Sequence, residues 1–76
     1  MGVTSKKSDY GPTIYDSWEK RQTVLTYMGY NPGQVDGHFG PKTDAAVKQF
    51  QKDNGITEAD WGPRTEYMAK WQLQKL

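Results

Sequence analysis

Cysteine is absent from this 76-residue chain, so no disulfide framework can hold the fold together. A single histidine, His38, leaves too few ligands for a catalytic zinc site, which usually takes two histidines or more. No apolar run approaches the length of a membrane span, and no apolar segment follows the basic residues near the N-terminus as a secretory signal requires. We therefore expect no metal, no cofactor and no membrane contact.

An excess of charge of one sign is also missing. Ten basic residues stand against nine acidic ones, a net charge of +1. A phosphate-backbone binder usually carries a clear basic excess. The charge balance therefore gives no reason to expect nucleic acid as a partner.

The length leaves room for one small domain whose core must rest on its aromatic and aliphatic residues. Residues 1–12 contain few apolar side chains, and we expect them to form a flexible N-terminal tail. Residues 13–76 form the predicted domain.

The chain contains an internal repeat. Residues 36–44 read Asp-Gly-His-Phe-Gly-Pro-Lys-Thr-Asp, and residues 58–66 read Glu-Ala-Asp-Trp-Gly-Pro-Arg-Thr-Glu. A proline at the first helical position, with an acidic residue in the first turn, is typical of a helix start. Each copy is therefore predicted to be a turn followed by a helix. The aromatic residue before each Gly-Pro, Phe39 or Trp61, is predicted to pack under its helix in the core.

Three helices are predicted, over about residues 16–28, 41–53 and 63–74. The first takes Asp16 or Thr13 as its N-cap, with Glu19 as the capping-box partner of Asp16. The second closes with Asn54-Gly55, a left-handed C-cap. The expected inner faces are Ile14, Trp18, Leu25 and Met28 for the first helix, Ala46, Val47 and Phe50 for the second, and Met68, Ala69 and Trp71 for the third.

A longer ordered pattern surrounds the first repeat. It has Gln22 in the first helix, a Gly29-Tyr30 corner, Val-Asp-Gly-x-Phe-Gly-Pro-x-Thr from residue 35, Ala-Val-x-x-Phe-Gln in the second helix, and an exit at Gly55-Ile56. This pattern resembles the small three-helix peptidoglycan-binding domain carried by many bacterial and phage cell-wall hydrolases. The resemblance covers about residues 13–76.

The resemblance implies an all-α fold, a small three-helix bundle. It also implies a noncatalytic module that binds peptidoglycan through its glycan, its stem peptide or both, and so brings an attached hydrolase to its substrate. Such a module is expected to be a monomer that acts at the bacterial cell wall, outside the cell or in the periplasm. A phage endolysin is one setting that would explain a missing secretion signal.

A peptidoglycan ligand calls for aromatic platforms, hydroxyl and amide partners, and a cation for its carboxylates. The loop of residues 30–40 joins two helices and is a sensible place for such a site. The candidate ligand-binding residues are Tyr30, Asn31, Asp36, His38, Thr43, Trp61, Arg64 and Tyr67.

Each candidate also has a structural reading. Asp36 is expected to be a turn-former that accepts backbone N–H groups, and His38 an exposed loop residue. Arg64 is equally a solvated surface cation. Tyr30 stands between a core role and a ligand contact.

Catalysis by this chain is not expected. The serines have no histidine base near them in the sequence, and three short helices do not build the deep cleft that a pair of glycosidase carboxylates needs. The alternative function is a protein-interaction domain, or a structural or regulatory part of a phage, on the same scaffold. An apolar patch at Trp71 and Leu76 would favour that alternative.

Overall fold

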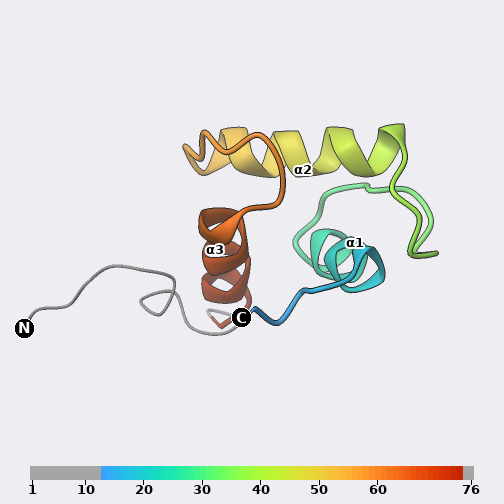
Figure 1. Ribbon diagram of the computed structural model, residues 1–76, viewed down its shortest axis with the longest axis horizontal. Coiled ribbons are helices and arrows are strands. Elements are labelled where there is room, and N and C mark those ends of the chain that lie inside the picture. The colour runs from blue at the N-terminus through green and yellow to red at the C-terminus, as the bar shows by residue number, and fades with distance from the viewer. Residues whose placement is uncertain (1–12, 75–76) are drawn as a thin grey trace, which may run out of the picture.

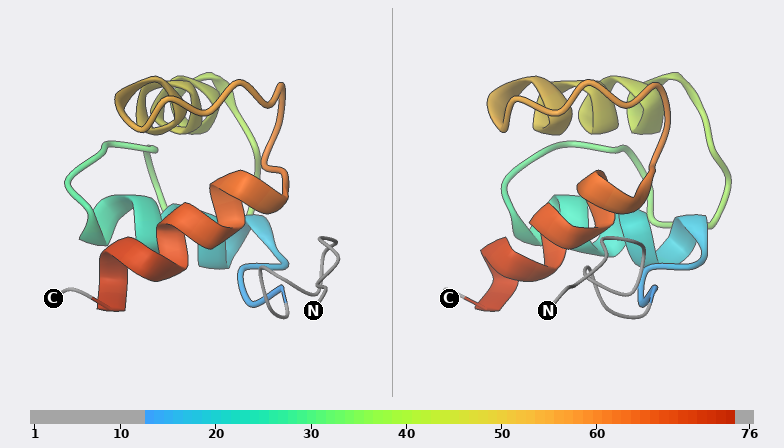
Figure 2. Two further views of the ribbon diagram at one scale, coloured as in Figure 1. Left: turned by 90° about the vertical axis from the view of Figure 1, so that its left-hand side faces the viewer. Right: turned by 60° about the vertical axis from the view of Figure 1, so that its left-hand side comes forward.

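The computed structural model describes residues 13–74, which form three helices: α1 (Trp18–Tyr27), α2 (Pro41–Asp53) and α3 (Pro63–Gln74). In Figure 1, α2 spans the top of the molecule, α1 lies beneath it seen nearly end-on, and α3 runs downward. The turned views of Figure 2 show that the helices cross one another. The described residues contain no strand, and the predicted all-α fold is confirmed. The predicted tail and Leu76 lie outside this range.

The core lies where the three helices meet. Leu25 of α1 and Ala69 of α3 are fully buried, and Phe50 of α2 is 1% exposed. Burying a side chain of the size of leucine or phenylalanine contributes about 1.5–3 kcal/mol. The remaining fully buried apolar residues are Val24, Ala46 and Val47.

The second and third helices have the predicted bounds, whereas the first starts two residues late. The N-cap is Ser17, whose Oγ accepts a hydrogen bond from the Lys20 N–H at 3.3 Å. Asp16 forms an exposed ion pair with the Lys20 Nζ at 3.0 Å. The predicted caps at Asp16 or Thr13, and the capping box with Glu19, were therefore wrong. Serine and aspartate cap helices about equally well, so the N-cap preferences of the two residue types do not distinguish Ser17 from Asp16.

The first two helices end in the same way. Gly29 and Gly55 take φ values of 96° and 67°, a region that favours glycine. The next N–H in each case bonds back into the helix: Tyr30 to the Leu25 carbonyl at 2.9 Å, and Ile56 to the Gln51 carbonyl at 2.8 Å. These are Schellman motifs, and they turn Tyr30 and Ile56 onto the core. The predicted C-cap at Asn54-Gly55 is confirmed.

The aromatic residues of the two repeats differ in burial. Trp61 is half-buried, stacks on Phe50 with ring centroids 6.4 Å apart, and packs against the core as predicted. Phe39 is 50% exposed and packs on Trp18, so its predicted core position was wrong. Trp71, predicted on the inner face of α3, is 45% exposed. Polar side chains occupy part of that face, namely Thr65 and Glu66, both buried.

The start of α3 is capped from outside the helix. The Glu58 Oε1 accepts hydrogen bonds from the Thr65 N–H at 2.9 Å and from its hydroxyl at 2.8 Å. The Glu58 Oε2 accepts from the Arg64 N–H at 2.9 Å. At the start of α2 the equivalent N-cap, Gly40, provides no side-chain cap. The repeats therefore share a backbone plan but differ at the helix start.

This difference predicts unequal effects of the substitutions Gly40→Ala and Gly62→Ala. A Cβ on Gly62 would lie 2.6 Å from the Glu58 carboxyl carbon, whereas one on Gly40 meets nothing within 4 Å. Because the Glu58 carboxylate must move away, Gly62→Ala should lower the free energy of unfolding by about 1 kcal/mol more than Gly40→Ala. Urea unfolding of both variants measures this difference.

The same experiment in a Glu58→Ala background provides the control. There the extra effect of Gly62→Ala should vanish, because no cap is left to displace. An equal penalty in both backgrounds would contradict the capping role of Glu58.

Candidate functional site

A buried glutamine shapes the loop between α1 and α2. Gln22 is 1% exposed. Its Oε1 accepts hydrogen bonds from the N–H groups of Asp36 (3.1 Å) and Gly37 (2.9 Å). Its Nε2 donates to the His38 carbonyl at 2.9 Å and to the Thr43 hydroxyl oxygen at 3.0 Å. One amide thus ties α1, the loop and the first turn of α2 together.

Thr43 links the Gln22 amide to the loop through its buried hydroxyl. It is 2% exposed, and its hydroxyl donates to the Pro32 carbonyl at 2.9 Å while accepting from Gln22. A hydroxyl with both roles filled has little left to offer a ligand. Thr43, a candidate ligand contact, therefore lies beneath the site and supports it.

Asp36 is the turn-former that its sequence context predicts. Its Oδ1 accepts from the His38 N–H at 2.9 Å, which closes an Asx turn at Gly37. This hydrogen bond lowers the pKa of the Asp36 carboxyl, and a weaker bond from Gln22 acts in the same direction. Asp36 is therefore ionised at neutral pH.

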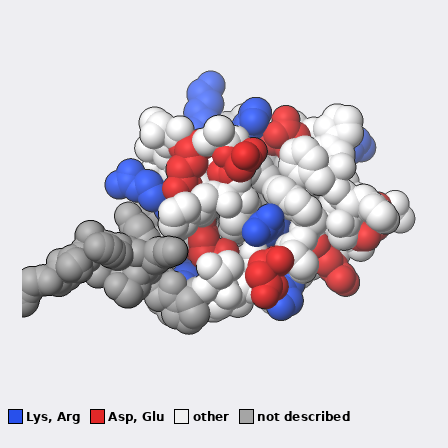
Figure 3. Space-filling view, in the orientation of Figure 1, with Lys and Arg blue, Asp and Glu red and all other residues white. Residues whose placement is uncertain are grey.

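The loop and the start of α2 enclose an open cleft of about 260 Å³. The predicted residues Asp36, His38 and Thr43 line it, with Lys42 beside them. His38 is exposed, so its imidazole can meet a ligand. Figure 3 shows acidic and basic side chains interspersed over one face of the molecule, without a large field of one sign. Gln22, Pro32, Gly33, Gln34, Gly40 and Pro41 complete the lining.

The other candidates lie elsewhere. Arg64 and Tyr67 line a smaller cleft of about 190 Å³ at the start of α3 and the end of α2. Trp61 lines a third cleft, of about 300 Å³, together with Arg21 and Glu66. The structure thus brings together only part of the predicted set.

Tyr30 and Asn31 begin the loop. The Tyr30 hydroxyl donates to the Asp53 carboxylate at 2.7 Å, and its ring meets Phe50 edge-on at 5.7 Å. Burial, with the Asp53 hydrogen bond and charge, raises the pKa of Tyr30 to about 12. The Asn31 Oδ1 accepts from the Gly33 N–H at 3.3 Å. Both side chains help to hold the loop ends in place.

The second repeat also has a buried glutamine that bonds to its turn. Gln51, 4% exposed, donates from Nε2 to the Asp60 carbonyl at 2.8 Å and to the Thr65 hydroxyl oxygen at 3.0 Å. These two bonds match those from Gln22 to His38 and Thr43. In the sequence, Gln51 stands only as the last residue of the second-helix pattern Ala-Val-x-x-Phe-Gln. The sequence does contain a signal for this role, because each Gly-Pro-x-Thr turn is preceded by a helix with a glutamine, Gln22 for Thr43 and Gln51 for Thr65.

Glu66 was predicted only as the acidic residue in the first turn of its helix, but it also fastens the N-terminal segment to α3. It is 4% exposed, and its Oε2 accepts from the N–H groups of Ile14 (2.7 Å) and Tyr15 (3.0 Å). Its Oε1 accepts from the Trp61 Nε1 at 3.0 Å. The domain is therefore closed by contacts between its first and last thirds.

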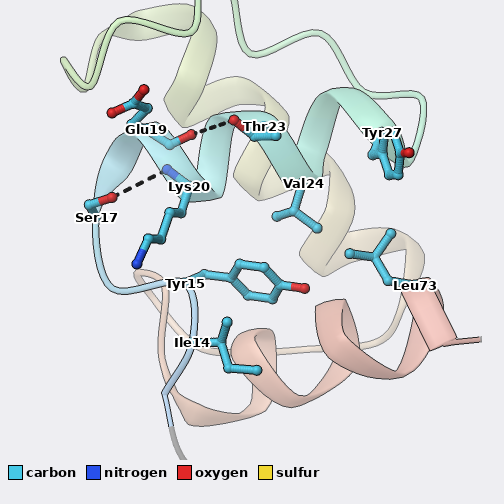
Figure 4. A pocket seen from close by; sticks show the side chains of 9 residues that line it. All are labelled: Ile14, Tyr15, Ser17, Glu19, Lys20, Thr23, Val24, Tyr27 and Leu73. Atoms are coloured by element: carbon cyan, nitrogen blue, oxygen red, sulfur yellow. Dashed lines mark hydrogen bonds between the residues drawn. The ribbon is translucent and has the colours of Figure 1, made fainter.

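A larger cleft than these three contains none of the predicted residues. It is an apolar groove of about 480 Å³ between α1, the segment before it and the end of α3. Figure 4 shows the Tyr15 ring reaching into this space, with Val24 above it and Leu73 beyond. Tyr27, 73% exposed, forms part of the rim. The groove joins residues far apart in the sequence, which is why local patterns did not indicate it.

Residues 13–74 contain neither a metal site nor a membrane-spanning helix. No three His, Cys, Asp or Glu side chains gather there in a way that could hold a metal ion. None of the helices in that range is both long and apolar enough to span a membrane.

Comparison with known families identifies the unit. The sequence model of the peptidoglycan binding domain matches residues 15–66, more than half of the chain. The chain belongs to this family. The matched region begins and ends at two residues that bond to each other, since the Tyr15 N–H donates to the Glu66 carboxylate. The resemblance drawn from the sequence pattern is confirmed.

The chain spans only a small part of the length of the curated relatives that it matches. The chain is 33% identical over 76 residues to YbfG of Bacillus subtilis, an alignment that covers 79% of this chain and 10% of YbfG. It is 31% identical over 67 residues to the N-acetylmuramoyl-L-alanine amidase CwlM of Mycobacterium tuberculosis, covering 86% of this chain and 16% of CwlM. No solved structure matches the chain.

The central role of Gln22 predicts the effect of Gln22→Leu. Leucine keeps much of the volume but leaves the Gly37 N–H and the His38 carbonyl without their Gln22 partner, and the Asp36 N–H with the Gln34 carbonyl alone. We expect the free energy of unfolding to fall by roughly 2–3 kcal/mol. Guanidinium unfolding measures this loss.

Thr23→Ala is the matched control, because Thr23 is the next residue of α1 and is exposed. It should change stability by no more than about 0.5 kcal/mol. Equal stabilities for the two variants would show that the Gln22 amide does not hold the loop.

Proposed function

We propose that this domain is a noncatalytic peptidoglycan-binding module, and that its ligand site is the cleft formed by the loop of residues 30–40 and the start of α2. Membership of the peptidoglycan binding domain family is the observation that carries the proposal. The hydrogen bonds of Gln22 add support, because they hold the cleft in one shape before any ligand arrives. A preorganised site loses less conformational entropy on binding.

The contrast between the repeats favours the first turn over the second. In the second repeat the Glu58 carboxylate occupies the space at the start of α3 and bonds to Arg64 and Thr65. In the first repeat Asp36 turns back onto its own loop, and the cleft beside it stays open. The space between the turn and the helix start is therefore filled by a carboxylate in the second repeat and open in the first.

The carboxylate of this site, Asp36, and that of Asp53 at the end of α2 suit binding better than hydrolysis. A glycosidase acid must hold its proton near neutral pH, which requires a raised pKa. The pKa of Asp36 is lowered, chiefly by the His38 N–H bond, and the pKa of Asp53 is lowered by bonds from Tyr30 and Gln49. Neither carboxylate is prepared for general acid catalysis.

The biological role follows as part of the proposal. A wall-binding module raises the local concentration of an attached catalytic domain on an insoluble substrate, so even weak affinity is useful. CwlM, an amidase by name, is a relative in which the matched region is a small part of a longer chain. We propose the same role here, for a monomer at the bacterial cell wall in a cell-wall hydrolase that is either bacterial or a phage endolysin.

A second candidate, docking of a protein partner, has one observation in its favour. The apolar groove between α1 and α3 is larger than the loop cleft, and its lining is mostly apolar. Apolar clefts of this size are common ligand sites. Variants can separate the two locations, because Tyr27 belongs to the groove and His38 to the cleft.

Retention on insoluble peptidoglycan tests the proposal. The purified domain should sediment with peptidoglycan at physiological salt, and not with cellulose or DNA-cellulose. The substitution His38→Ala should weaken retention about fivefold or more, because it removes an exposed contact at the cleft. Circular dichroism confirms that the variant is folded.

The substitution Tyr27→Ala is the matched control, an exposed aromatic residue at the far end of α1. It should bind like the wild type. Loss of retention in Tyr27→Ala alone would move the site to the groove, and no retention of the folded wild type would reject the proposed function.

A further inference from the structure

Phe39 is the aromatic residue of the first repeat that the fold leaves at the surface. Its ring is 50% exposed, whereas Trp61, its counterpart, stacks on Phe50 and donates its indole N–H to Glu66. Phe39 contributes little to the core in this position. The repeat pattern alone would have placed both rings inside.

The Phe39 ring is nevertheless held firmly. It lies against Trp18 with ring centroids 4.6 Å apart and planes inclined by 49°. The Arg21 guanidinium lies 4.7 Å from the centroid of the Trp18 ring, and the Arg21 Nε donates to the Tyr15 carbonyl at 2.8 Å. Phe39 therefore rests on an ordered stack of side chains. An aromatic surface fixed in this way binds with little loss of side-chain freedom.

The backbone at Phe39 is fixed as well. Its neighbours His38 and Gly40 both line the loop cleft. The His38 carbonyl accepts from the buried Gln22 amide, and Gly40 is the N-cap of α2. The Phe39 ring does not line the cleft itself, but its two neighbours in the chain do, so the ring lies beside the cleft. An extended ligand could occupy both.

The charges around Phe39 favour a neutral ligand group. At the cleft, Asp36 is anionic and Lys42 is cationic. His38, the residue before Phe39, also lines the cleft. Charges of opposite sign at the cleft give no net attraction for a free carboxylate of a stem peptide, which would also meet Asp36 there. A sugar ring has an apolar face for an aromatic side chain and hydroxyl or acetamido groups for the polar neighbours.

We propose that Phe39 is a sugar-stacking residue beside the loop cleft, and that the glycan strand is the part of peptidoglycan that the domain recognises. This inference rests on the proposed function. One sugar ring packs against the exposed face of Phe39, and a neighbouring sugar of the same strand lies in the cleft with Asp36 and His38.

Substitutions at Phe39 test the inference. The substitution Phe39→Ala should weaken retention on peptidoglycan about tenfold, while Phe39→Trp, which keeps an aromatic face, should retain binding. Phe39→Leu restores apolar bulk without a ring and should behave like Phe39→Ala. Tyr27→Ala should bind like the wild type, because Tyr27 lies outside the cleft.

A second measurement identifies the bound part. Soluble oligomers of N-acetylglucosamine, titrated into the wild type, should shift the nuclear magnetic resonance signals of the Phe39 ring. A soluble stem peptide of the same wall type should shift them much less. If Phe39→Ala fails to fold, the comparison of Phe39→Leu with Phe39→Trp, and this titration, still decide the question.

The outcomes separate the inference from the proposed function. Wild-type retention with equal binding by folded Phe39→Ala, or saturation by the stem peptide alone, would reject the role of Phe39 and leave the wall-binding function standing. No retention of the wild type would reject both.

Discussion

The amide of Gln22 is the interaction on which the arrangement of this domain depends. It sits at the point where α1, the loop and the start of α2 meet, and it serves backbone N–H groups, a carbonyl and a hydroxyl at once. A 76-residue domain without disulfides has few other means of fixing an irregular loop, since its apolar core lies between the helices. Buried polar groups that are fully satisfied specify one conformation, whereas partly satisfied ones destabilise it. The described residues leave no buried side-chain polar atom without a partner. The family pattern around Gln22 is therefore largely a description of this hydrogen-bond arrangement.

The repeat shows how one structural plan can support two roles. Gln51 and Thr65 reproduce the Gln22 and Thr43 pair, so both turns are held by an amide from the preceding helix. The longer side chain of Glu58, at the position of Asp36, reaches the next helix and caps it. The Glu58 carboxylate therefore fills the space at the start of α3 that is open at the start of α2. The first turn is left with an open cleft and an exposed Phe39, which is why we assign the ligand to it.

Much of the fold could be predicted from the sequence, because its signals are local. The prolines that start α2 and α3 have a φ already set for a helix, and the glycines that follow α1 and α2 take a positive φ that few other residues adopt. The errors fall where tertiary contacts decide. Phe39 packs on Trp18 at the surface, a contact that no local pattern indicates. The N-cap is Ser17 and not Asp16, and the two residue types cap helices about equally well. The candidate site was predicted in part, since the loop residues meet at one cleft while Arg64 and Trp61 lie at others. The α1–α3 groove joins Tyr15 to Leu73, and no local pattern links residues so far apart.

The central claim is that the loop cleft held by Gln22 is the peptidoglycan site. The most direct measurement is a nuclear magnetic resonance titration of the isotopically labelled domain with soluble fragments of digested peptidoglycan, following every backbone amide. The account predicts that the perturbed amides cluster at residues 36–43, with Tyr27 and Leu73 unchanged. Perturbations centred on the groove between α1 and α3, or none at all with a folded domain, would contradict it.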